Sequence, residues 1–137
     1  MHHTQKEYDF PDNLYASWWK KAKAYGVFKE NQLIAAIELC PESWSNRLLI
    51  TELWVDSSFR RQGIGSLLID FAKNKTLKHN YRALLLETQS CNTTAVDFYF
   101  HQGFILFGFD RCCYQNDDVK RKEVRLNLGW FNPQYQK

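Results

Sequence analysis

Apolar residues in the first part of the chain form short runs rather than a helical repeat. In residues 25–39, two such runs flank a polar turn at Glu30–Gln32, which predicts a hairpin of two strands. Residues 46–55 form another apolar run after the turn-like sequence PESWSN, and this run predicts a third strand. We therefore expect this region to supply consecutive strands of one sheet.

Helical spacing begins after the third predicted strand. Apolar side chains three and four residues apart predict an amphipathic helix from Gly65 to about Asn74, through Ile64, Leu67, Leu68, Phe71 and Ala72. Arg82–Gln89 then indicates an apolar strand of the buried kind. Asn92 is a suitable N-cap for a second helix, and Gly103 would end that helix.

Two apolar segments close the chain. Phe104–Tyr114 and Glu123–Phe131 predict two last strands, joined by the polar sequence QNDDVKRK. Hairpins followed by crossovers predict an α/β fold with a mixed sheet and helices packed on it, and not a doubly wound parallel sheet. The length of 137 residues favours a single domain over residues 1–137.

Composition argues against several classes of function. The net charge of +3, without a long run of Lys or Arg, is not typical of a nucleic-acid binder. No apolar stretch approaches the roughly 20 residues of a membrane span, and the N-terminus lacks the apolar segment of a signal peptide. We therefore expect a cytoplasmic protein with no nucleic-acid or membrane partner.

The cysteines favour reduced thiols over a metal site. Without a secretion signal, a disulfide framework is not expected. No C-x-x-C pair occurs, so the spacing does not support zinc and no metal is expected. The four residues concerned are Cys40, Cys91, Cys112 and Cys113.

The turn Arg60–Ser66, with the sequence RRQGIGS, joins the third predicted strand to the first helix. The unpaired N–H groups of a first helical turn attract an anion. Gly63 and Gly65 would let the backbone approach a phosphate, and Arg60 and Arg61 would add charged donors. The longer G-x-G-x-x-G fingerprint and the P-loop pattern are both absent. The turn therefore predicts a phosphate site, with an ordinary tight turn as the alternative.

Two motifs together resemble a known family. The turn fits Arg/Gln-x-x-Gly-x-Gly, with Arg60, Gly63 and Gly65 in register, and residues 92–104 follow with Asn, Ala, Phe-Tyr and Gly-Phe. In order and separation these motifs resemble the GNAT family of N-acetyltransferases. The sequences LETQ and GFD resemble, more closely, the streptothricin acetyltransferases within that family, over about Val27–Phe131. The resemblance implies acetyl transfer from acetyl-CoA to a primary amine of a small molecule in a ternary complex, and a part in antibiotic resistance.

The resemblance also implies a fold and a cofactor site. The sheet would be GNAT-like, mixed and mostly antiparallel, with the pantetheine arm of acetyl-CoA between two splayed strands. Asn92 would hydrogen-bond that arm, with a role as N-cap alone as the alternative. Members usually begin with another strand and one or two helices, so we expect the first strand to be missing or shortened, with residues 13–24 as part of a helix. The remaining residues expected to bind the cofactor are Leu53, Trp54, Val55, Arg60, Arg61, Gln62, Gly63, Ile64, Gly65 and Ser66.

Three side chains are candidates for the chemistry. Tyr99, at the Phe-Tyr position, stays protonated at neutral pH and can donate to the leaving thiolate; the alternative is a core aromatic. Glu52 and Glu87 are candidates for the base that takes the amine proton, or for holding an ammonium group. The alternative for each is a solvated or salt-bridged carboxylate. Asp110 is a weaker candidate for acceptor binding.

The acceptor stays open between a streptothricin-like antibiotic, a polyamine and a peptide N-terminus. An alternative from another class is a non-catalytic module that binds acyl-CoA without turnover. The resemblance also implies a homodimer formed through the last strands.

Overall fold

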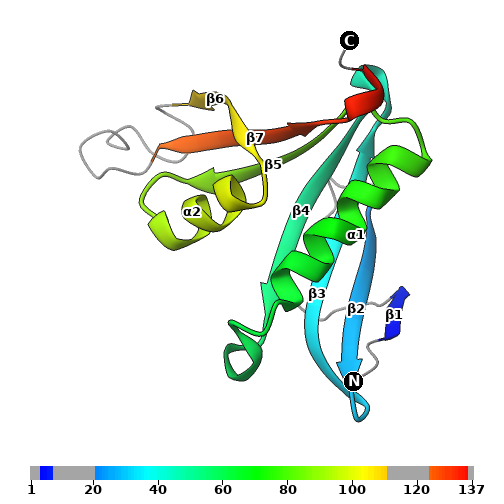
Figure 1. The fold of residues 1–137 in the computed structure, drawn as a ribbon. Coiled ribbons are helices and arrows are strands. Elements are labelled where there is room, and N and C mark those ends of the chain that lie inside the picture. Colours follow the sequence, from blue (N-terminus) through cyan, green and yellow to red (C-terminus); the bar gives the residue numbers. More distant parts are fainter. Residues whose placement is uncertain (1–3, 8–20, 111–123, 136–137) are drawn as a thin grey trace.

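The computed structural model describes residues 4–7, 21–110 and 124–135, and its strands form one seven-stranded sheet (Figure 1). The strand order is β1-β2-β3-β4-β5-β7-β6, and every neighbouring pair is antiparallel except β4 and β5. The expected mixed, mostly antiparallel sheet is therefore confirmed. The elements are β1 Thr4–Glu7, β2 Lys23–Lys29, β3 Gln32–Glu42, β4 Arg47–Val55, α1 Ile64–Lys78, β5 Ala83–Gln89, α2 Thr93–His101, β6 Ile105–Asp110 and β7 Arg125–Phe131, with short 3-10 turns at Ser43–Ser45, Ser57–Phe59 and Pro133–Tyr135.

The first strand, expected to be missing or shortened, is present and short. β1 pairs antiparallel with residues 25–28 of β2 and so forms the edge of the sheet. Residues 23 and 24, at the end of the segment predicted as part of a helix, belong to β2. Most of that segment lies outside the described residues, as do Cys112, Cys113 and the predicted strand beyond Asp110.

The predicted hairpin is confirmed as β2 and β3. Glu30 and Asn31 both have positive φ, at 51° and 68°, and join the strands in two residues. Such a pair of left-handed residues gives the chain the twist that a tight hairpin needs. Gln32, predicted as part of the turn, pairs with Lys29 and opens β3.

Helix α1 covers one face of β3, β4 and β5 (Figure 1) and runs four residues past its predicted end. The extension was hidden in the sequence because a polar residue, Thr76, takes a fully buried position there. Its hydroxyl donates to the Ala72 carbonyl at 2.9 Å, so it needs no other partner. The helix packs on the sheet through a single apolar core, which includes Ile37, Leu39, Leu48, Ile50, Ile64, Leu68, Ile69, Ala72, Leu84, Leu86 and Leu128.

Strands β4 and β5 part after a short parallel ladder. They pair only from Arg47 with Ala83 to Ile50 with Leu86. β4 then continues on β3, and β5 continues on β7, so the two strands diverge as Figure 1 shows. Among the described strands, none fills the gap, and helix α2 follows β5 on one side of it.

A bulge in β4 lies where the parting begins. Glu38 pairs with Glu52, but the next partners are Leu39 and Ile50, so Thr51 is an extra residue in β4. The bulge changes which side chains face α1. Before it, Leu48 and Ile50 lie in the core, and beyond it the odd-numbered Leu53 packs against the core. Glu52 and its partner Glu38 therefore project from the opposite face.

Candidate functional site

The turn before α1 has the backbone expected of an anion site. Gly63, the N-cap of α1, has φ 80°, and no side chain caps the helix. A Cβ added at Gly63 would meet no atom of the described residues within 4 Å, so among them only the backbone angle and a bound ligand would require glycine there. Arg60 and Arg61 are exposed beside it, and Arg61 also has a positive φ of 64°. The turn thus presents helix N–H groups and guanidinium groups to solvent.

Gly65 has a packing role in addition to the cofactor binding predicted for it, which stays a prediction. A Cβ at this position would lie 3.1 Å from the Phe98 ring of α2, so glycine lets the two helices approach closely. Ser66 also joins them, because its hydroxyl accepts a hydrogen bond from the Gln102 side chain at 2.8 Å. Ile64 is buried in the core, whereas Gln62 is exposed in the turn.

The strand segment Leu53–Val55 borders the gap between β4 and β5. These residues pair with β3 on one side, and β5 no longer pairs with them on the other. The Trp54 side chain is 42% exposed, while the two neighbouring side chains pack against the core. The backbone edge on the β5 side can therefore pair with an extended ligand.

Asn92 caps α2, as predicted. Its side-chain oxygen accepts a hydrogen bond from the Ala95 N–H at 3.3 Å. The side chain is exposed at the start of the helix. The capping role is observed, and binding of the pantetheine arm stays a prediction.

Tyr99 of α2 and Glu52 of β4 influence each other electrostatically although they lie in different elements. Burial, and then the negative charge of Glu52, raise the pKa of Tyr99 to about 12. Partial burial, and then the negative charge of Glu38, raise the pKa of Glu52 above its ordinary value. Because the Glu52 side chain remains exposed to solvent, its desolvation is modest. Tyr99 is thus held protonated within electrostatic range of a carboxylate that binds a proton more readily than usual.

Tyr99 is also packed among aromatic rings. Its ring lies 5.3 Å from that of Phe98 and 5.8 Å from that of Phe104, both in edge-on geometry. These contacts with the core fix the side chain. The aromatic packing that was the alternative for Tyr99 is observed together with its proximity to Glu52.

Glu87 is exposed and forms an ion pair with Arg125, whose side chain is partly buried. It is the first residue of β5 beyond the β4 ladder, and its carboxylate lies 3.5 Å from the Arg125 guanidinium. The salt-bridged alternative is therefore observed for this carboxylate. The backbone of Asp110 also pairs with Arg125, in the β6–β7 ladder, and the position of the Asp110 side chain lies outside what the structure describes.

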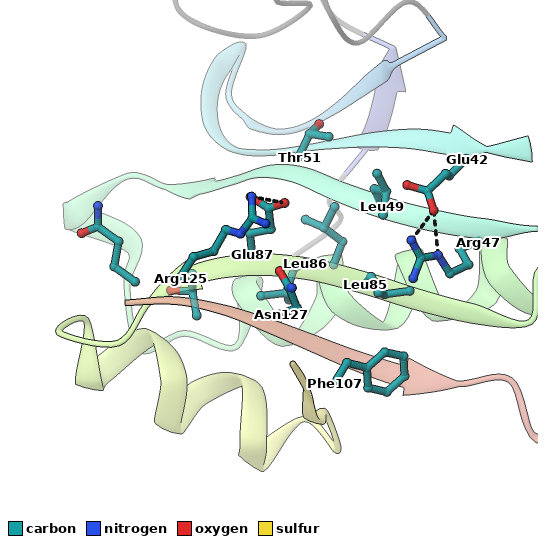
Figure 2. A pocket seen from close by; sticks show the side chains of 13 residues that line it. Glu42, Arg47, Leu49, Thr51, Leu85, Leu86, Glu87, Phe107, Arg125 and Asn127 are labelled. Atoms are coloured by element: carbon teal, nitrogen blue, oxygen red, sulfur yellow. Dashed lines mark hydrogen bonds and ion pairs between the residues drawn. The ribbon is translucent and has the colours of Figure 1, made fainter. Parts of the chain in front are cut away.

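A pocket of about 630 Å³ lies between β4, β5 and β7 (Figure 2). Leu49 lines it and alternates with Leu48 and Ile50 of the core, so the pocket opens mainly on the face opposite α1. Its other lining residues are Glu42, Arg47, Thr51, Leu85, Leu86, Glu87, Thr88, Gln89, Phe107, Arg125 and Asn127, with Ile50 at its edge.

The pocket contains two ion pairs that the sequence analysis did not identify. Figure 2 shows Glu42 with Arg47 on one side, and Glu87 with Arg125 on another. Apart from Glu87, which lies in the sequence LETQ, no motif marks these residues, because each pair joins different strands. Only their opposite charges at strand positions could have suggested them.

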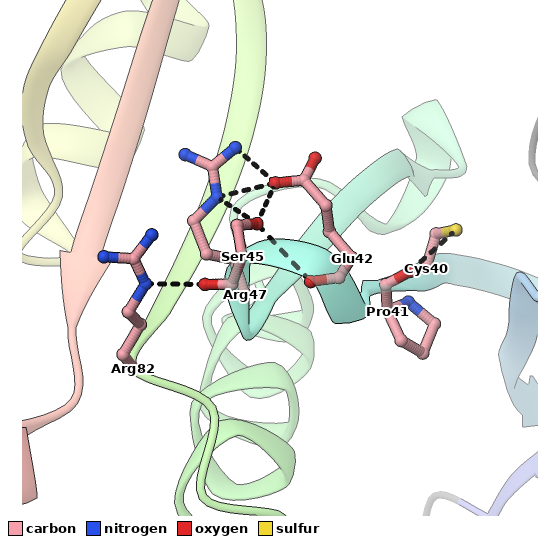
Figure 3. A network of polar contacts seen from close by, with 6 residues as sticks. All are labelled: Cys40, Pro41, Glu42, Ser45, Arg47 and Arg82. Atoms are coloured by element: carbon pink, nitrogen blue, oxygen red, sulfur yellow. Dashed lines mark hydrogen bonds and ion pairs between the residues drawn. The ribbon is translucent and has the colours of Figure 1, made fainter.

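The Glu42–Arg47 pair belongs to a network at the β3–β4 turn (Figure 3). Arg47 Nε donates to the Glu42 carboxylate at 2.7 Å and to the Ser45 hydroxyl at 3.0 Å. Arg82 Nε donates to the Ser45 carbonyl at 2.6 Å and so ties the turn to the start of β5. Trp44, on the same turn, is 83% exposed, with the Arg47 guanidinium 5.7 Å from its ring centre. The network holds one wall of the pocket in place.

Two kinds of feature are absent from the described ranges, 4–7, 21–110 and 124–135. No group of His, Cys, Asp or Glu there has the arrangement of a metal site. Neither described helix is long and apolar enough to cross a membrane.

Comparison with known proteins gives consistent matches. A model of the acetyltransferase (GNAT) family matches residues 2–104. Streptothricin acetyltransferase of Escherichia coli is 32% identical over 108 residues, which are 79% of this chain and 62% of that protein. Streptothricin acetyltransferase A of Bacillus subtilis strain 168 is 31% identical over 112 residues, which are 82% of this chain and 64% of that protein.

A solved structure supports the same grouping. A candidate streptothricin acetyltransferase of Bacillus anthracis strain Ames, in complex with acetyl coenzyme A, matches with a TM-score of 0.73 and 32% identity. The match covers 81% of this chain and 62% of that one. The chain thus spans less than two thirds of the length of these relatives.

Proposed function

The chain belongs to the acetyltransferase (GNAT) family, and we propose that it transfers an acetyl group from acetyl-CoA to a primary amine of a small molecule. The observation that carries this proposal is the parting of β4 and β5 beside the Tyr99–Glu52 pair. The gap can hold a thioester, and the two side chains can handle the protons of the reaction.

Acetyl-CoA would bind along the N-terminus of α1 and into the gap. The pyrophosphate would lie on the Arg60–Ser66 turn, where exposed arginines and uncapped N–H groups favour negative charge. The pantetheine arm would pair with Leu53–Val55 of β4 and approach Asn92. Backbone N–H groups of β4 would polarise the acetyl carbonyl.

The amine would approach from the pocket on the other face of the sheet. A primary amine of the lysine type is mostly protonated at pH 7, so a base must first remove a proton. Glu52 is our choice for that base, because its pKa is raised and it projects from β4 where that strand parts from β5. The neutral amine then attacks the acetyl carbon and the carbon–sulfur bond breaks; the nitrogen loses its second proton to water, and the departing thiolate takes one up from water, to give CoA and the amide.

Tyr99 would stabilise the departing sulfur. A thiol with a pKa of about 8.5 is a stronger acid than a tyrosine with a pKa of about 12. Tyr99 therefore acts mainly by donating a hydrogen bond to the developing thiolate, rather than by complete proton transfer. Such a charge-assisted hydrogen bond is strengthened by the low dielectric constant of the buried environment around the Tyr99 ring.

Glu87 would hold the acceptor rather than take its proton. It lies in the pocket, paired with Arg125, where an ammonium group could share its carboxylate. A streptothricin-like antibiotic is supported as acceptor by the relatives that carry that name. A polyamine and a peptide N-terminus remain the acceptors to compare with it.

Three further proposals concern the number of domains, the oligomeric state and the location of the protein. We expect one domain, because every described strand belongs to the same sheet. A homodimer through the last strands is supported by the exposed apolar side chains of Ile105, Leu106 and Phe131. We also propose a cytoplasmic location, where acetyl-CoA is available.

Calorimetric titration with acetyl-CoA, followed by a streptothricin-type amine with thiol release recorded, tests the proposed function. Binding followed by release supports acetyl transfer, and competition with a polyamine and a short peptide then ranks the acceptors. Binding without release from any amine supports the non-catalytic module. Absence of acetyl-CoA binding overturns the assignment of the Arg60–Ser66 turn.

A further inference from the structure

Glu38 is a carboxylate in an unusual position. Its side chain is fully buried in β3. Burying a charged group there costs free energy unless the group is paired and hydrogen-bonded. It is paired in register with Glu52 of β4, so two carboxylates lie directly opposite each other on the same face. Like charges opposite each other destabilise a sheet. Packing of the fold alone therefore gives no reason for this pair.

The Glu38 carboxylate is fastened to the bulge of β4. The Thr51 hydroxyl donates to Glu38 Oε1 at 2.5 Å and lies 3.3 Å from the Glu38 carbonyl oxygen. Thr51 is the extra residue of the bulge and follows Ile50, the last residue of β4 paired with β5. Glu38 thus contacts the point where the two strands part and where the side chains of β4 change faces.

The charged and titratable groups around the pair come from several elements. On β3, Cys40 and Glu42 project from the same face as Glu38, and burial raises the pKa of the Cys40 thiol, with Glu38 and Glu42 adding to the rise. Lys21 lies near Cys40 and acts in the opposite direction. From α2, Tyr99 is the titratable group on which the charge of Glu52 acts.

We propose that Glu38 is a positioning residue, whose buried carboxylate holds the β4 bulge through Thr51 and keeps Glu52 ready to accept the amine proton. The proposal rests on the proposed function, because it assigns a purpose to Glu52 in acetyl transfer. The proton moves from the ammonium nitrogen to a Glu52 carboxylate oxygen, and no other reactant is needed. Glu38 touches neither substrate nor cofactor and acts through its neighbours.

The direction of the effect follows from the charges. A negative Glu38 opposes ionisation of Glu52 and so raises its pKa. Glu38→Gln keeps the shape and an oxygen that can accept from Thr51, but removes the charge. The pKa of Glu52 should then fall, and the weaker base should give a lower rate at the plateau of the pH profile.

The test compares Glu38→Gln with Glu30→Gln, which removes the same charge at an exposed turn residue. Carboxyl-labelled protein is titrated by ¹³C NMR, and kcat/KM for the amine is measured against pH. In Glu38→Gln we expect the Glu52 midpoint and the acid side of the profile to move to lower pH. In Glu30→Gln both should stay at the wild-type pH. An unmoved Glu52 midpoint in folded Glu38→Gln overturns the proposal.

A second variant covers the case in which Glu38→Gln does not fold. Thr51→Val keeps both carboxylates and removes the hydroxyl that ties Glu38 to the bulge. We expect its kcat to fall several-fold more than its KM for acetyl-CoA rises, with a displaced Glu52 midpoint. Wild-type values of kcat and of the midpoint in Thr51→Val would contradict the proposal. The NMR titration reports on the carboxylate pair even if no amine is acetylated, so failure of the proposed function is recognised separately.

Discussion

The two faces of the central strands differ sharply in chemistry although they share the same backbone. The face toward α1 is apolar and buried, with Leu48, Ile50 and Leu84 in one continuous core. The opposite face carries the pocket, two ion pairs and the Glu38–Glu52 pair. Because strand side chains alternate, one set of residues can hold the fold while the next set is free to do chemistry.

The largest expected effect is on the face that carries the chemistry. Glu52→Gln should lower kcat/KM for the amine about 100-fold or more, because a positioned base contributes about 10²–10⁴ in rate. Acetyl-CoA affinity and thermal stability should stay near the wild-type values. Steady-state kinetics with a calorimetric binding control measure both. Turnover equal to wild type in Glu52→Gln would show that Glu52 is not the base.

Substitutions on the core face should lower the free energy of unfolding rather than the catalytic rate. Leu68 of α1 is fully buried against the sheet, while its neighbour Leu67 on the same helix is 38% exposed, so the two form a matched pair. Leu68→Ala should cost about 2–5 kcal/mol in the free energy of unfolding, whereas Leu67→Ala should cost under about 1 kcal/mol. Urea unfolding measures the difference. Equal losses in the two variants would contradict the assigned packing of α1.

Two substitutions at Gly63 distinguish backbone strain from steric exclusion of a bound phosphate. Gly63→Val and Gly63→Asn both add a Cβ where a phosphate would lie, but asparagine tolerates positive φ much better. If the phosphate approaches this backbone, both variants should weaken acetyl-CoA binding, by about tenfold. Loss of affinity in the valine variant alone would indicate strain, and unchanged affinity in both would count against the phosphate site.

The smallest effect is expected at the exposed ion pair of the pocket. Glu87→Gln should raise the KM for the amine about threefold, since exposed pairs contribute about 0.2–1 kcal/mol. The acid side of the pH–rate profile should keep its position, because we assign the base to Glu52. A shifted or flattened profile would return the role of base to Glu87.

Much of the architecture could be predicted from local patterns. The hairpin, Asn92 as N-cap and the alternation of strands and helices depend on neighbouring residues, and each is confirmed. Family membership followed from two motifs and is confirmed by the family match. The short β1 and the last turn of α1 were harder to foresee, because one is an edge strand of four residues and the other buries a threonine.

The sequence by itself determined which side chains are available and the motif that places a glycine turn before α1. The tertiary structure alone decided which way Glu52 points. Strict alternation from Leu48 and Ile50 would put Glu52 on the core face, and the extra residue Thr51 reverses this. The bulge depends on pairing with Glu38, thirteen residues away in the chain. Register between strands is a property of the assembled sheet, so no local pattern in β4 could reveal it.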